Sequence, residues 1–213
     1  KHDVLTTRVF ENTPTGNWWI IQDMNKEVQI GDGTNNSLEV GIILAASLAH
    51  KGIQSGRSVG FIANNQNHSW ITAQHASDQS MKILHTLALS EAGDSPLDDL
   101  LTKSRDSFHQ AASLVIITPD LSLTWWESLL WLKAKGMTPT ILLLDPSSFD
   151  TSGDITEALT KFRNAGIQAY GIQADMFADQ IKIEEEPLWE WRVFGTGQAI
   201  PVKKPKDQDW KRI

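Results

Sequence analysis

Trp18-Trp19-Ile20-Ile21-Gln22-Asp23 is a short apolar run that ends in a carboxylate. Its length and its aromatic and β-branched residues predict a strand buried on both faces, as the strands of a parallel sheet are. Similar apolar runs follow at residues 59–63, 114–118, 139–144 and 167–172. Because turn residues and helical stretches separate these runs, the chain predicts a doubly wound, mostly parallel α/β sheet with helices on both faces.

Helices are predicted between the strands because apolar residues recur there at helical spacing. The predicted helices span residues 38–51, 79–91, 96–110, 124–135 and 155–165. Ser37 is the expected N-cap of the first helix, and Gly52 is expected to end it. Residues 70–73 follow a polar turn and predict one antiparallel edge strand, paired in a hairpin with the strand at 59–63.

The length of 213 residues fits one globular domain with a short appendage. The pattern changes at Glu184-Glu185-Glu186-Pro187, so we expect a domain over residues 1–183 and a partly extended C-terminal extension with a charged tail over 184–213. The formal net charge of −7 disfavours binding to nucleic acid. The chain has no cysteine, which excludes disulfides and thiolate metal sites. No apolar run reaches the roughly 18 residues of a membrane helix, so we expect no membrane contact from this segment itself.

Three polar segments follow strands or lie on loops that reach the same edge of the sheet. They are Asp23-Met24-Asn25-Lys26-Glu27, Gly93-Asp94-Ser95-Pro96-Leu97 and Thr118-Pro119-Asp120. Ligands of doubly wound sheets bind at the carboxyl ends of the strands, so Asp23, Ser95 and Asp120 are expected to meet there. Each residue also suits a plain structural role. Asp23 can accept backbone N–H groups of its loop, and the other two can cap a helix or form a turn.

In their order and spacing, the three segments resemble the metal-binding loops of a von Willebrand factor A domain. The wider pattern resembles one branch of these domains, the bacterial domain-of-unknown-function family number 58. The stretches that carry this likeness are Asn36-Ser37-Leu38-Glu39-Val40, Ala45-Ala46-Ser47-Leu48-Ala49, Ser58-Val59-Gly60-Phe61-Ile62-Ala63, Pro96-Leu97-Asp98-Asp99-Leu100-Leu101, Val115-Ile116-Ile117-Thr118-Pro119, Leu143-Leu144-Asp145-Pro146 and Gly166-Ile167-Gln168-Ala169-Tyr170. The resemblance covers residues 9–178 and implies a von Willebrand A-like, Rossmann-like fold.

The resemblance implies a metal-ion-dependent adhesion site formed by Asp23, Asn25, Glu27, Ser95 and Asp120. Such domains usually carry Asp-x-Ser-x-Ser in the first loop, a Thr in the second and an Asp in the third. Here Asn25 and Glu27 replace the two serines and Ser95 replaces the Thr, so the site is degenerate. Its ligands would all be oxygen atoms, which suit Mg²⁺ or Ca²⁺.

The resemblance also implies a protein-interaction module in which a carboxylate of the partner completes the coordination shell. Members of family 58 are commonly larger bacterial proteins with membrane helices upstream, and they often occur alongside MoxR-type AAA ATPases. We therefore expect a non-enzymatic module with a MoxR-type AAA ATPase as its partner. Its expected location is the cytoplasm, or the cytoplasmic face of a membrane as part of a longer protein.

Two alternatives stay open. Asp23 and Asp120 could hold a cation that activates water in a hydrolase, although no histidine lies in their loops. The domain could instead be a structural scaffold without a functional edge. The sequence contains no Gly-x-Ser-x-Gly elbow, Walker loop or Gly-x-Gly-x-x-Gly fingerprint, which disfavours α/β-hydrolase and nucleotide chemistry.

Overall fold

The computed structural model describes residues 17–177 except 34 and 110, and the two segments 190–193 and 199–203. The chain divides into two compact units, Lys1–Phe177 and Ala178–Ile213. In the second unit, β9 (Glu190–Val193) pairs antiparallel with β10 (Ala199–Lys203). The domain boundary predicted at residues 183/184 lies outside the described residues.

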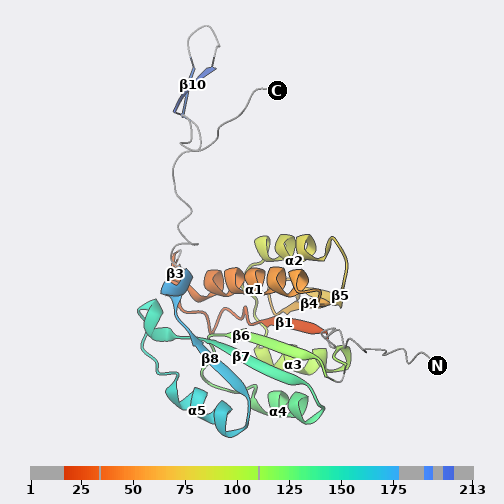
Figure 1. Cartoon of the computed structure of the whole chain (residues 1–213). Coiled ribbons are helices and arrows are strands. Elements are labelled where there is room, and N and C mark those ends of the chain that lie inside the picture. Colours follow the sequence, from red (N-terminus) through yellow and green to blue (C-terminus); the bar gives the residue numbers. More distant parts are fainter. Residues whose placement is uncertain (1–16, 34, 110, 178–189, 194–198, 204–213) are drawn as a thin grey trace, which may run out of the picture. The chain divides into compact units, whose positions relative to one another are not determined.

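A six-stranded sheet forms the centre of the first unit (Figure 1). Its strands, in spatial order, are β5 (Trp70–Gln74), β4 (Val59–Ala63), β1 (Trp18–Gln22), β6 (Ser113–Thr118), β7 (Thr138–Leu144) and β8 (Gln168–Ile172). Every neighbouring pair is parallel except β4 and β5, which form the predicted antiparallel hairpin. The predicted sheet is therefore confirmed. Strands β1 and β6 have helices on both faces, which explains why they read as continuous apolar runs.

Helices lie on both faces of this sheet (Figure 1). One face carries α1 (Ser37–Gln54) and α2 (Gln79–Ala88), and the other carries α3 (Leu97–Ser104), α4 (Trp126–Ala134) and α5 (Thr156–Asn164). Short elements complete the unit, namely β2 (Gly31–Asp32), β3 (Asn35–Asn36) and the 3-10 turns η1 (Arg105–Ser107), η2 (Pro146–Phe149) and η3 (Ala174–Phe177). In the part of the chain that the structure describes, no helix has the length and apolar character of a membrane span.

Aromatic side chains fill much of the core between the sheet and α3, α4 and α5. Trp19 is buried and meets the ring of Phe108 edge-to-face, with centroids 5.3 Å apart. Trp125 is fully buried and stacks on Phe162 at 5.8 Å, while the half-buried Trp126 lies 5.7 Å from the same ring. These rings fix α4 and α5 against each other, because aromatic pairs favour defined geometries.

Several predicted helix boundaries were wrong. The N-cap of α1 is Asn36 instead of Ser37, and its side chain accepts a hydrogen bond from Glu39 N at 2.9 Å. Gly52 does not end α1, which continues to Gln54 before Gly56 adopts a left-handed φ of +74°. Helix α2 ends at residue 88 instead of 91, and α3 at residue 104 instead of 110.

Candidate functional site

The loops that follow β1, β4 and β6 meet the α2–α3 loop where the strand order reverses between β1 and β6. We call this edge the rim; it comprises residues 23–30, 64–69, 89–96 and 119–125. Lys26 N donates a hydrogen bond to Gly93 O at 2.9 Å, and Gly93 N donates one to Met24 O at 2.9 Å. Only glycine fits at position 93, since a Cβ there would overlap a backbone oxygen of the loop after β4. The first two polar segments therefore lie side by side.

Asp23 lies at the centre of the rim and is 3% exposed. Its Oδ1 accepts hydrogen bonds from Asn64 Nδ2 at 2.9 Å and from Asn25 N at 3.1 Å. Its Oδ2 accepts a hydrogen bond from Thr118 Oγ1 at 2.8 Å. The same hydroxyl accepts a hydrogen bond from Asp120 N at 3.0 Å, so it joins the third polar segment to the first.

Asn64, the first residue after β4, links three parts of the rim and is fully buried. Its Nδ2 donates to Ser95 O at 2.6 Å as well as to Asp23, and its Oδ1 accepts from Met24 N at 2.6 Å. A buried amide whose donors and acceptor are all paired fixes the positions of the groups around it. The Asn64 amide therefore joins the loops after β1 and β4 to the α2–α3 loop.

The rim leaves the Asp23 carboxylate without a positive partner. Neither salt bridge among the described residues involves Asp23 or Asp120. Burial, the largest influence, raises the pKa of Asp23 above its ordinary value of 3.8, and the negative charge of Asp120 raises it further. Hydrogen bonds from Asn64, Thr118 and the Asn25 amide oppose this rise in the pKa. Since the influences that raise the pKa are the larger, the surroundings of Asp23 favour a proton or a cation.

The other predicted metal ligands take different positions. Asn25 is buried, and its Oδ1 accepts a hydrogen bond from Glu27 N at 3.2 Å. Asp120 is 7% exposed, and its Oδ1 accepts a hydrogen bond from a backbone N–H of its own loop. Ser95 is half-buried and is not the helix cap that its sequence suits, because Pro96 holds the N-cap position of α3. Glu27 is exposed at the outer side of the loop.

The donor chemistry of the rim fits a hard cation. The rim offers carboxylate oxygens from Asp23 and Asp120, an amide oxygen from Asn25 and a hydroxyl oxygen from Ser95. Mg²⁺ and Ca²⁺ prefer oxygen ligands of these types. Within residues 17–177 there is no group of three or more His, Cys, Asp or Glu side chains arranged for a metal. A cation at the rim would therefore depend on the amide and hydroxyl oxygens as well as on the two carboxylates.

Two residues of the rim, Asn64 and His68, and the last residue of β6, Thr118, were not recognised in the sequence as residues that link the rim. Asn64 looked like one of several turn residues, and Thr118 looked like the last residue of a strand. His68, from the same turn as Asn64, lies with Nε2 3.3 Å from Ser95 Oγ and has a left-handed φ of +49°. The only local signal was that all three lie at or just beyond the end of an apolar run, where the rim forms.

Comparisons with known proteins bear on the fold. No protein-family model matches the sequence, and no curated protein matches it. A solved structure of the conserved hypothetical protein BatB from Bacteroides thetaiotaomicron is 13% identical, with a TM-score of 0.53 over 78% of this chain and 97% of that chain. The SpRpn10 VWA domain is 11% identical, with a TM-score of 0.53 over 78% of this chain and 94% of that chain.

Proximal thread matrix protein 1 from the mussel byssus is a third similar structure. It is 12% identical, with a TM-score of 0.52 over 79% of this chain and 46% of that chain. At such identities a likeness shows the fold alone. Combined with the strand order and the single antiparallel edge strand, it shows that this chain has a von Willebrand A-like α/β fold.

Proposed function

We propose that this chain is a protein-interaction module whose rim binds its partner through a degenerate metal-ion-dependent adhesion site. The observation that carries the proposal is the position of Asp23, a buried carboxylate at the topological switch point. It accepts hydrogen bonds from Asn64, in the loop after β4, and from Thr118, the last residue of β6. A buried charge needs a partner, and no described cationic side chain provides one. The fold supports the proposal, because its switch point is where such sheets bind ligands.

In this proposal Asp23, Asn25, Ser95 and Asp120 hold a Mg²⁺ or Ca²⁺ ion, and the exposed Glu27 closes its outer side. The ion would neutralise the two carboxylates and offer a coordination position to a carboxylate of the partner. Asn64 would keep the Asp23 carboxylate oriented, as residues behind metal ligands commonly do. Binding of a partner would then depend on the divalent cation.

The wider context is part of the same proposal. On the resemblance to family 58, we infer that the chain works as part of a larger bacterial membrane-associated protein, with its rim on the cytoplasmic side. A MoxR-type AAA ATPase is then the first partner to test. Co-purification of this ATPase with the wild-type chain, and its loss when Mg²⁺ is removed by EDTA, is the expected result.

Calorimetric titration of Mg²⁺ and Ca²⁺ tests the cation. The wild-type chain is expected to give binding heat, and Asp23→Ala is expected to give none. Asp94→Ala is the matched control, because Asp94 is an exposed rim carboxylate that already pairs with Lys26. Equal heats in the wild type and Asp23→Ala would exclude a cation site at Asp23. The proposal would then reduce to an interaction module that needs no metal.

Replacement of both rim carboxylates separates an interaction module from a scaffold. A chain with Asp23→Ala and Asp120→Ala is expected to lose its protein partner in a pull-down while keeping its far-ultraviolet circular dichroism. If the partner is retained at full strength, the rim is not the binding surface and the scaffold alternative is favoured.

A metal-assisted hydrolase is a second candidate, and one contact favours it. His68 Nε2 lies 3.3 Å from Ser95 Oγ, so a general base stands at the rim where the sequence alone placed none. A cation held by the carboxylates would supply activated water, and His68 would accept the proton. An esterase and phosphatase screen tests this candidate. Activity that disappears in Asp23→Asn and His68→Ala, but not in the exposed control His85→Ala, would replace the first proposal.

A further inference from the structure

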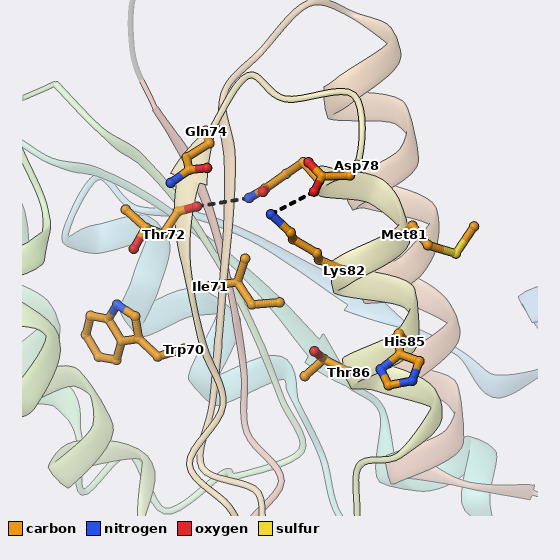
Figure 2. A pocket seen from close by; sticks show the side chains of 10 residues that line it. Trp70, Ile71, Thr72, Gln74, Asp78, Met81, Lys82, His85 and Thr86 are labelled. Atoms are coloured by element: carbon orange, nitrogen blue, oxygen red, sulfur yellow. Dashed lines mark hydrogen bonds and ion pairs between the residues drawn. The ribbon is translucent and has the colours of Figure 1, made fainter.

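The edge strand β5 has a free side. It is the last strand of the sheet, and β4 pairs with one of its two edges. Within the described residues no strand pairs with the other edge. Together β5 and α2 form a groove of about 730 Å³ (Figure 2). Its lining residues are Trp70, Ile71, Thr72 and Gln74 from the strand, and Asp78, Gln79, Met81, Lys82, His85 and Thr86 from the helix and its N-cap.

The groove is held open by a buried glutamine at the start of α2. Gln79 Nε2 donates hydrogen bonds to Val59 O at 2.7 Å and to Thr72 O at 2.9 Å, which fixes the helix against β4 and β5. Figure 2 shows Ile71 and Lys82 pointing toward one another from the strand and the helix. Since the helix is anchored by these bonds, the groove exists before anything binds to it.

Apolar side chains are exposed along α2. Met81 is 70% exposed, Leu89, one residue beyond the helix, is 67% exposed, and Leu84 is also exposed. Trp70 of β5 is 41% exposed and packs edge-to-face on Trp19 at 6.4 Å, on the face of the sheet opposite α2. A free strand edge next to exposed apolar side chains is a surface that tends to pair with another chain.

The charges on α2 favour a second copy of the same helix. Asp78 stands at the start of α2 and forms an exposed ion pair with Lys82, one turn later, at 2.9 Å. A copy of α2 that runs in the opposite direction presents these charges in reverse order. Lys82 of each copy would then face Asp78 of the other, so the surface is complementary to itself.

The acidic ends of the other helices lie outside this contact. The first turns of α1, α3, α4 and α5 hold five carboxylates, namely Glu39, Asp98, Asp99, Glu127 and Glu157. The first turn of α2 has no acidic residue within the helix. Two copies can therefore approach through α2 without bringing their acidic ends together.

We propose that β5 and α2 form the contact between two copies of this chain, related by a twofold axis. The two β5 strands pair antiparallel, as identical strands do across such an axis, and extend the sheet from one copy into the other. The two α2 helices lie antiparallel beside them and cover Met81 and Leu89. Lys82 of each copy forms an ion pair with Asp78 of the other copy. This contact does not use Asp23, Asn25, Ser95 or Asp120.

The opposite edge of the sheet offers a weaker surface. Strand β8 is also terminal, but Tyr170 is its exposed large apolar residue and the flanking helix α5 ends with the cations Lys161 and Arg163. Tyr170 therefore provides a matched control for Met81, on the other edge of the same sheet.

Sedimentation velocity and light scattering of the full chain test the proposal. The wild type is expected to have twice the mass of one 23.7 kDa chain and to dissociate on dilution. Met81→Glu is expected to be monomeric, because it places an acid in the apolar part of the contact. Tyr170→Glu is expected to stay dimeric. Both residues are exposed, so circular dichroism should show both variants folded.

A charge exchange tests the arrangement of the helices. Lys82→Glu and Asp78→Lys are each expected to be monomeric, because each brings like charges together across the axis. An equimolar mixture of the two is expected to form heterodimers, in which both charge pairs are restored. Failure of the mixture to associate would overturn the antiparallel arrangement.

Two further outcomes would overturn the proposal as a whole. One is a wild-type chain that stays monomeric at the highest concentration reached. A peptide of another protein would then be the candidate ligand of the groove. The other is a dimer that Tyr170→Glu dissociates and Met81→Glu does not, which would place the contact at β8.

Discussion

Asn64 determines the geometry of the rim, although in the sequence it is only the first residue of the turn Asn64-Asn65-Gln66-Asn67-His68. It bonds Asp23, Ser95 and the Met24 amide at once, and none of these residues is its neighbour in the chain. A short polar side chain with two donors and one acceptor suits this position because all three partners converge there. The rim therefore depends on this amide as well as on the Asp23 carboxylate.

Asn64→Ala is expected to lower the free energy of unfolding by roughly 2 to 3 kcal/mol, because it leaves the buried Met24 amide without a partner and removes hydrogen bonds to Ser95 O and Asp23 Oδ1. Urea denaturation measures this change. Asn67→Ala is the control: Asn67 is exposed in the same turn, and its removal should cost no more than about 0.5 kcal/mol. Equal costs for the two variants would contradict the role of Asn64.

The raised pKa of Asp23 predicts a dependence of stability on pH. A group whose folded pKa lies above its unfolded value stabilises the fold fully below the unfolded pKa, and this contribution is lost as pH rises through the folded pKa. In EDTA, the wild type should therefore lose stability relative to Asp23→Asn as pH rises from 4 toward neutrality. Denaturant titrations across this range measure the difference, and a constant difference would contradict the raised pKa. Mg²⁺ should reverse the loss if the cation binds.

At the level of elements, close contacts explain where the predicted boundaries fail. Gly52 was expected to end α1 because glycine often follows a helix, yet it lies inside the helix and against the sheet. A Cβ at Gly52 would come within 2.5 Å of Trp18 Cε3 and 2.8 Å of Val59 Cγ2. The glycine is thus required by packing between α1 and the first strands, a contact that no local pattern reveals.

Gly52→Ala is expected to destabilise the chain by roughly 1 to 2 kcal/mol. Alanine favours a helix over glycine by about 1 kcal/mol, but the clash with Trp18 outweighs this gain. Thermal or urea unfolding measures the change. Ser47→Ala, on the exposed side of the same helix, should leave stability within about 0.5 kcal/mol of the wild type. A stabilised Gly52→Ala chain would contradict the close contact.

At the level of the whole molecule, the first unit holds the complete α/β sandwich. All six strands of the sheet and the five helices that cover it lie before residue 178. Helices α1, α3 and α4, which follow rim loops, carry acidic first turns and basic last turns, an arrangement that matches the helix dipoles. The rim end is thus acidic and the opposite end basic, which favours a divalent cation at the rim.

A chain that ends at Phe177 is expected to fold by itself. Its thermal midpoint should lie within about 3 °C of that of the full chain, a shift that corresponds to roughly 1 kcal/mol in a domain of this size. Scanning calorimetry measures the midpoint. A chain that ends at Ala165 lacks β8 and should unfold at a much lower temperature, because β7 then loses a partner strand. A large shift for the chain that ends at Phe177 would show that the first unit does not fold by itself.

The sequence by itself determined the layered architecture. Apolar runs such as residues 18–22 and 114–118 and the helical spacing between them depend on near neighbours in the chain, so they can be read without coordinates. The antiparallel hairpin of β4 and β5 was also predictable, because a short polar turn joins two apolar runs. The order of the polar segments placed Asp23, Ser95 and Asp120 at one edge for the same reason.

Only the tertiary structure decided which atoms meet at that edge. Thr118 and Asp23 are 95 positions apart, and Asn64 and Ser95 are 31 apart, yet each pair is joined by a hydrogen bond. Such contacts arise from the packing of loops and side chains across the sheet, which no local periodicity encodes. The same reason explains the helix boundary at Gly52 and the position of His68 beside Ser95: both depend on residues that are distant in the chain.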